Sequence, residues 1–192
     1  MRLAIVLSLV FAASAAVGQS ALWTQVSPGH LPPAFQPATL SPAQLSSLHS
    51  LLRQEGSFGD WGCEASDMQD LFNGLRFSRI PVSSGKQTIL VEAGPGCARG
   101  AQGANGAMWL LHFKGAAPVL LATPRAGFSG WVDSVQPPSH HGYRDVVLGW
   151  HVSAVDAELS YFRFDGKLYR RIGSASLLTD ENGQSKIVPK TE

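Results

Sequence analysis

The sequence predicts an α+β fold rich in β-strands, with an N-terminal helix packed on an antiparallel sheet or sandwich made of two tandem four-stranded meanders. Three observations lead to this fold class. Residues 41–56 have the apolar spacing and the end signals of one amphipathic helix. After Leu75 the chain divides into short β-rich runs separated by Gly, Pro, Ser or Asn. These runs fall into two groups of four, which indicates an internal repeat.

Residues 1–18 are predicted to form a secretory signal. Arg2 is the only charge before LAIVLSLVFAASAAV, an apolar run that ends in small residues and is short for a membrane span. We expect cleavage after residues 16–18 (AVG), with 13–15 (ASA) as the alternative. No cysteine lies near either position, so a lipid anchor is not expected. The expected location is therefore the periplasm or the extracellular medium.

The charge balance argues against nucleic acid and anionic lipid as partners. The chain has 15 Lys and Arg against 14 Asp and Glu, and Arg2 lies in the signal. The exported protein therefore has no net charge with which to attract a polyanion. No later segment is apolar and long enough for a membrane helix.

We expect that the protein binds no cofactor. We expect its partner to be an envelope or extracellular protein or glycan.

The length of the exported chain is typical of one globular domain, or of two small units that share a core. The segment containing SPGHLPPAFQP should run extended over the surface or remain loose, outside the core, because proline fixes φ and removes a hydrogen-bond donor. The expected divisions after the signal are a Pro-rich leader at 19–40, a single domain at 41–178 and a polar C-terminal tail at 179–192. Within the domain we expect a helical part at 41–75 and two β repeats, at 76–125 and 126–178.

The segment SPAQLSSLHSLLRQEG predicts the helix. Ser41 can cap its N-terminus, Pro42 suits the first turn, and Gln44 completes a capping box. Gly56 is expected to end it. The apolar stripe consists of Leu45, Leu48 and Leu52. A shorter helical turn is expected in SDMQDLFNGL, with four residues facing inward: Met68, Leu71, Phe72 and Leu75.

The eight predicted strands form two similar groups. The clearest correspondence is between FKG at 113–115 and FDG at 164–166, each between the third and fourth strand of its group. The eight runs are FSRIPVS, TILVEAG, AMWLLHFKG and APVLLATP, followed by SGWVDSVQ, DVVLGWH, ELSYFRFDG and KLYRRIGS.

The dipeptide Asp-Gly at 165–166 is expected to form a two-residue hairpin turn, because both central positions of such a turn favour positive φ. That turn would place Phe162 opposite Tyr169 and Tyr161 opposite Arg170, as ordinary cross-strand pairs.

Cys63 and Cys97 are the two cysteines of the chain, and in an exported protein we expect them to form one disulfide. The chain-entropy model assigns such a loop about 3.8 kcal/mol of stabilisation. Neither cysteine lies in a Cys-x-x-Cys motif or beside a basic cluster that would lower its pKa, so a reactive thiol is the less favoured alternative.

HGYRDVVLG is similar to the residues that begin a strand in FG-GAP-type β-propeller blades, and GYRDVV…HVSA…ELSYFRFDGKLY resembles exported bacterial proteins of unknown function. The resemblance covers about the last hundred residues. It implies four-stranded blades, but closed propellers have at least four of them, so two repeats cannot close a ring. Assembly of a propeller from several chains is the alternative. The family binds calcium through an Asp-rich loop, whereas the loop here is PPSHHG without spaced carboxylates, so calcium binding is not expected.

No catalytic or metal motif is visible in the sequence. GFSGW lacks the Gly-x-Ser-x-Gly spacing of a nucleophile elbow. No HxH or HExxH spacing prepares a metal site. A metal would require three or four of these residues to converge: His140, His141, His151, Asp145, Asp156 and Glu158. We therefore predict no catalytic residue and no metal ligand.

The sequence favours a non-enzymatic, inhibitor-like or glycan-binding module of the cell envelope over a hydrolase or metal enzyme whose site assembles only in three dimensions. The strand region contains Trp109, Trp131 and Trp150. Some of these tryptophans must fill the core, and any that is exposed is a candidate for ligand contact. In DVVLGWH, alternation directs His151 away from the face of Trp150. The candidate ligand-binding residues are Trp131, Trp150 and His151.

Overall fold

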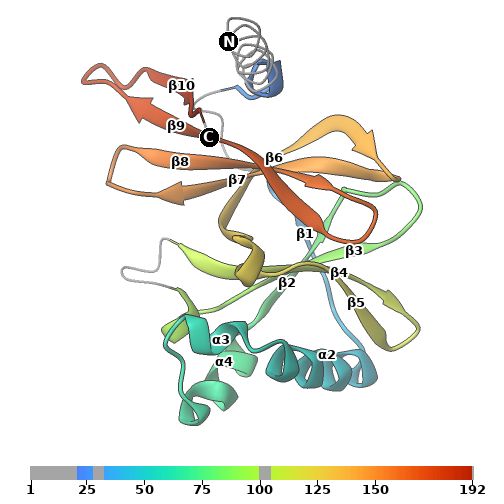
Figure 1. Ribbon diagram of the computed structural model, residues 1–192. Coiled ribbons are helices and arrows are strands. Elements are labelled where there is room, and N and C mark those ends of the chain that lie inside the picture. The colour runs from blue at the N-terminus through green and yellow to red at the C-terminus, as the bar shows by residue number, and fades with distance from the viewer. Residues whose placement is uncertain (1–20, 28–32, 100–104, 192) are drawn as a thin grey trace, which may run out of the picture.

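The computed structural model describes residues 21–27, 33–99 and 105–191 (Figure 1). The predicted signal at 1–18 lies outside the described residues. The elements of the described chain are, in order, β1 (Gln36–Pro37), α2 (Pro42–Glu55), α3 (Ser57–Asp60), α4 (Met68–Gly74), β2 (Arg76–Ile80), β3 (Thr88–Glu92), β4 (Gly106–Lys114), β5 (Ala117–Ala122), β6 (Ser129–His140), β7 (Tyr143–His151), β8 (Ala157–Phe164), β9 (Tyr169–Thr179) and β10 (Ser185–Pro189).

The predicted β-rich α+β class is confirmed. Neighbouring strands are antiparallel in the order β1-β2-β3-β4-β6-β7-β8-β9-β10, and β5 pairs with β4. Strands β2 to β5 and β6 to β9 each form a four-stranded meander. The internal equivalence of these two meanders stays a prediction.

The two meanders are joined by a short pairing of β4 with β6, where Gly106 lies opposite Gly130 and Ala107 opposite Ser129. Gly130 has a φ of 99°, and a Cβ built on it would lie 1.9 Å from the carbonyl oxygen of Gly149. Only glycine fits where β6 leaves its pairing with β4 and passes this close to β7.

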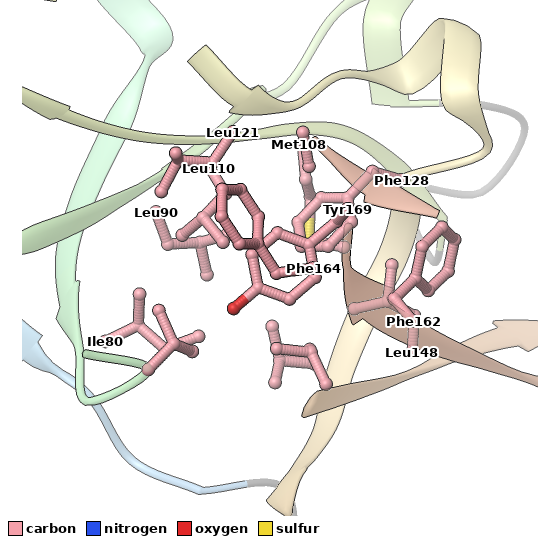
Figure 2. Packing of buried hydrophobic residues seen from close by; sticks show 14 of the residues in the cluster. Ile80, Leu90, Met108, Leu110, Leu121, Phe128, Leu148, Phe162, Phe164 and Tyr169 are labelled. Atoms are coloured by element: carbon pink, nitrogen blue, oxygen red, sulfur yellow. The ribbon is translucent and has the colours of Figure 1, made fainter. Parts of the chain in front are cut away.

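The sheet forms two layers, with β2 to β5 below and β6 to β9 above in Figure 1, and the helices lie under the lower layer. The space between the layers is filled by an apolar cluster that takes side chains from both meanders, as Figure 2 shows for Leu110, Phe128, Phe162 and Tyr169. All four are fully buried. This two-sided burial is what holds the meanders together.

The helical layer covers the other face of the lower meander. α2 has the predicted capping box: Gln44 N–H donates to Ser41 Oγ at 3.3 Å, and Ser41 N–H donates to Gln44 Oε1 at 3.0 Å. Gly56 ends the helix with a φ of 77°. Leu48 and Leu52 are fully buried in the cluster that contains Trp109 of β4. The predicted helix is therefore confirmed, and Trp109 belongs to the core.

The predicted disulfide is also confirmed. Cys63 follows α3, and Cys97 begins a 3₁₀ turn after β3. Their Sγ atoms are bonded, with the two Cα atoms 5.2 Å apart. Both cysteines pack against the apolar cluster under the helices. The bridge therefore fastens the helical layer to the end of β3.

The fold extends beyond the expected domain limits at both ends. Trp23 and Val26, in the segment predicted as a leader outside the core, are each 5% exposed. They cover the outer face of the upper meander, where Trp23 meets Tyr161 edge-on with ring centroids 5.8 Å apart. The segment predicted as a C-terminal tail contains β10, whose Ile187 packs on the same face. An apolar outer face needs a cover, and the two ends of the chain supply it.

The predicted register of the β8–β9 hairpin is wrong. Phe164, not Phe162, lies opposite Tyr169, and Tyr161 lies opposite Gly173. The turn has four residues instead of two, because Asp165 Oδ1 accepts hydrogen bonds from two backbone N–H groups further along, at 2.8 Å each. This Asx-type closure lengthens the loop and moves the cross-strand partners by two residues, and an irregularity between Tyr161 and Phe162 moves the partner of Tyr161 one residue further.

Candidate functional site

Exposed apolar side chains gather at one hairpin tip. Among the described residues, the large hydrophobic side chains that are exposed are Trp150 (36%), Val152 (62%), Val155 (61%), Leu178 (37%) and Val188 (41%). The first three belong to the end of β7 and the loop that leads into β8. We call residues 150–156 the β7–β8 tip.

Hydrogen bonds within the loop hold the tip in one shape. Val152 and Ser153 donate their N–H groups to the Asp156 carbonyl oxygen at 3.1 and 3.2 Å. Ser153 Oγ accepts from the N–H groups of Val155, at 3.2 Å, and Asp156, at 2.9 Å. Asp156 Oδ1 in turn accepts from Thr179 N–H on β9 at 3.3 Å. The polar side chains of the loop are therefore used internally, while both valines point to solvent.

The base of the tip is fixed by Asn105. Its side chain pairs with the backbone of His151 in both directions: His151 N–H donates to Oδ1 at 2.8 Å, and Nδ2 donates to the His151 carbonyl oxygen at 2.9 Å. An amide with this geometry substitutes for a neighbouring strand at the end of β7. This anchor joins the start of β4 to the tip.

Trp131 and His151 stack on one face of β7, with ring centroids 4.1 Å apart and planes at 31°. Trp131 lies opposite Gly149, and a Cβ at Gly149 would come within 2.1 Å of the indole. The absence of a side chain at Gly149 is what allows the indole to lie on the strand.

Trp150 is on the opposite face, where its ring centroid lies 5.9 Å from that of Trp61, which follows α3. The structure therefore places the three predicted ligand-binding residues at one end of β7 but on two faces, with His151 turned away from Trp150 as the alternation predicts. Their role in binding stays a prediction.

Sequence reasoning missed Val152, Val155 and the anchor Asn105, because a Val-Ser-Ala-Val loop has no sequence signal for exposure.

The residues considered for a metal site are dispersed. Four of them have separate partners: His151 stacks on Trp131, Asp156 accepts from Thr179, Glu158 pairs with Lys190 at 2.9 Å, and the His141 ring lies over Gly166. No three His, Cys, Asp or Glu side chains in the described part of the chain come close enough together to hold a metal ion.

His140 and Asp145 do meet, at 3.5 Å between Nε2 and Oδ2. Asp145 is fully buried, and the same Oδ2 accepts from Arg163 Nε at 3.1 Å and Nη2 at 3.0 Å. Tyr161 lies beside them; burial first, and then the Asp145 charge, raise the pKa of Tyr161 to about 12. The guanidinium compensates the buried carboxylate, which is the usual arrangement of a structural ion pair.

Comparison with protein-family models, with curated proteins and with solved structures finds no match. In the part of the chain that the structure covers, no helix is long and apolar enough to cross a membrane.

Proposed function

We propose that this chain is an exported, non-enzymatic, inhibitor-like binding module that docks on a protein through the β7–β8 tip. The observation that carries the proposal is the grouping of three exposed apolar side chains, Trp150, Val152 and Val155, at one hydrogen-bonded hairpin tip. Exposed large apolar residues that occur singly need no explanation, whereas a contiguous group marks an interaction surface. Tryptophan is also among the residues that dominate binding energy at protein interfaces.

The chemistry of the tip favours a protein over a glycan. Ser153 Oγ and Asp156 Oδ1 already accept backbone hydrogen bonds, and the most exposed side chains beside them are the aliphatic Val152 and Val155. Valine side chains fit an apolar cleft on a partner. Because the loop is already ordered, docking loses little conformational entropy.

Export to the periplasm or the medium is part of the same proposal. It is supported by the predicted signal and by the Cys63–Cys97 disulfide, since disulfides persist in oxidising compartments. Mass spectrometry of the protein from its native cells tests it. We expect a mature N-terminus at Gln19 and no free thiol; a chain that keeps residues 1–18 would contradict export by cleavage.

Capture from envelope extract and from culture medium tests the binding proposal. Three baits are compared: wild type, the double variant Val152→Glu and Val155→Glu, and the control Lys167→Glu, which adds negative charge at the opposite end of β8. We expect a protein that binds wild type and the control at a fixed stoichiometry and binds the double variant roughly tenfold or more weakly, because the glutamates would be buried in an apolar cleft.

Three outcomes contradict the proposal. In the first, every captured protein binds the double variant as well as wild type. In the second, the chain binds insoluble envelope glycan and loses that binding on Trp131→Ala but not in the double variant. Turnover of an esterase, peptidase or glycosidase substrate that is lost on Asp145→Asn or His151→Ala would indicate an enzyme instead.

A further inference from the structure

Two neighbouring cavities lie at the other end of β7 from the tip. One, of about 370 Å³, is lined by residues that include Gln44, Arg79, Lys86 and His112. The other, of about 490 Å³, lies between the β1 segment and the β2–β3 connection. Arg79, Lys86 and Gln87 line both, so the two cavities adjoin each other. Volumes of this size are typical of small-molecule sites.

The charge of the cavities is one-sided. Lys86 and Arg79 are cationic, and neither cavity has an Asp or Glu among its lining residues. Within the described residues, no carboxylate forms an ion pair with either cation. Lys86 Nζ instead lies 5.6 Å from the centroid of the Tyr143 ring. Two cations that share cavity walls without a carboxylate favour an anionic ligand.

His112 adds a buried polar atom without a partner. It comes from β4, is 5% exposed, and its Nδ1 lies 3.4 Å from the Tyr143 hydroxyl. Its Nε2 is buried and has no hydrogen-bond partner in the described structure. Burial first, and then the charges of Lys86 and Lys114, lower the pKa of His112, so the ring is neutral at pH 7. The contact with the Tyr143 hydroxyl fits either direction. The proposal uses the tautomer in which Nδ1 accepts the Tyr143 proton, which leaves at Nε2 an N–H donor without an acceptor.

The second cavity is mainly apolar. Its walls include Pro33, Phe35, Ile80 and Pro81. Phe35 packs against the central apolar cluster, and Ile80 belongs to it. A ligand that fills both cavities therefore needs an apolar body next to an anionic head.

We propose that the two cavities form one site for a small amphipathic oxyanion, with an alkyl chain in the apolar cavity and a carboxylate or phosphate head between Lys86, Arg79 and His112. The site is independent of the β7–β8 tip, since it uses other residues at the opposite end of the strand. A carboxylate or phosphate head supplies acceptors to the two cations and to the His112 donor.

Calorimetric titration of the disulfide-bonded exported protein with octanoate, below the concentration at which it forms micelles, tests the proposal. Octyl phosphate distinguishes the two head groups, and octanol and octyltrimethylammonium are the controls for the apolar chain alone and for the opposite charge. We expect one of the two anions to bind, and each control to bind at least tenfold more weakly. Equal binding of octanol would overturn the oxyanion assignment, and absence of binding by both anions would overturn the site.

The matched variants are Lys86→Gln and Arg79→Gln, compared with Lys186→Gln on β10, which lines neither cavity. All three side chains are exposed, so none of the substitutions disturbs the core. We expect roughly tenfold weaker binding for the first two and unchanged binding for the third, together with a ligand-induced shift of the His112 ring resonances in NMR spectra. Equal losses in all three variants would show general electrostatic attraction, and unshifted His112 resonances would place the anion elsewhere; either result overturns the proposal.

Discussion

Strand β8 has a hairpin loop at each end, and the two loops differ in what they show to solvent. Each is closed by one side-chain oxygen that accepts two backbone N–H groups: Ser153 Oγ at the β7–β8 tip and Asp165 Oδ1 at the β8–β9 turn. The tip exposes Val152 and Val155, whereas the turn exposes Asp165, whose Oδ2 pairs with Arg170 at 3.1 Å. Closing a hairpin on this strand therefore requires no exposed apolar group, and the valines need another explanation.

Removal of the disulfide should have the largest effect and should act unequally on the two loops. Replacing Cys63 and Cys97 together by Ala should lower the free energy of unfolding by up to about 3.8 kcal/mol. Cys97 lies eight residues before Asn105, which anchors the base of the tip, so the tip should lose more hydrogen-exchange protection than the β8–β9 turn. Urea unfolding and native-state hydrogen exchange measure both effects. Equal loss of protection at the two loops would contradict the link between the bridge and the tip.

Gly149→Ala should disturb the tip but not the turn. The added methyl group would lie 2.1 Å from the Trp131 indole, so the ring must leave its place on β7 and lose its stacking on His151. We expect a loss of about 1–3 kcal/mol, the usual range for overpacking, and a change in tryptophan fluorescence. Gly59→Ala is the control, because its Cβ would meet nothing within 4 Å. A Gly149→Ala variant with unchanged stability and fluorescence would contradict the described packing.

The β8–β9 turn should show a smaller, acid-dependent effect. The backbone N–H groups of Leu168 and Lys167 lower the pKa of Asp165 from 3.8 to about 2. A lowered carboxyl pKa contributes stability above the unfolded-state pKa and loses it as the pH falls through the folded-state value, so the loss should occur between about pH 4 and pH 2. Asp165→Asn keeps the Oδ1 acceptor and should unfold with a weaker pH dependence in that window. Identical pH profiles for the variant and wild type would contradict the described role of the carboxylate.

The sequence predicted those parts of the fold that depend on local chemistry. The ends of α2 follow from Ser41, Gln44 and Gly56, whose side chains or conformations act within a few residues. The pairing of Cys63 with Cys97 was predicted from the expected export and from the number of cysteines. The strand runs were visible because β-rich segments alternate with turn residues.

The remaining features depend on contacts between distant segments. Asp165 can close a two-residue or a four-residue loop, and its side-chain hydrogen bonds decide between the two registers. Trp23 is in the core because the outer face of the upper meander needs a cover. Lys86 and His112 line the same cavity because the start of β3 lies beside the end of β4. Neither the tip nor the cavities could therefore be predicted from short motifs.

The most direct test of the central claim is the affinity of the purified captured partner for variants that charge one end of β8 or the other. Val152→Glu with Val155→Glu alters the tip, and Lys167→Glu alters the β8–β9 turn, which is also exposed and hydrogen-bonded but polar. Surface plasmon resonance should give a Kd raised roughly tenfold or more for the tip variant and unchanged for the turn variant. A tip variant that binds with the wild-type Kd, or a turn variant weakened as much as the tip variant, would contradict the assignment of the β7–β8 tip as the docking surface.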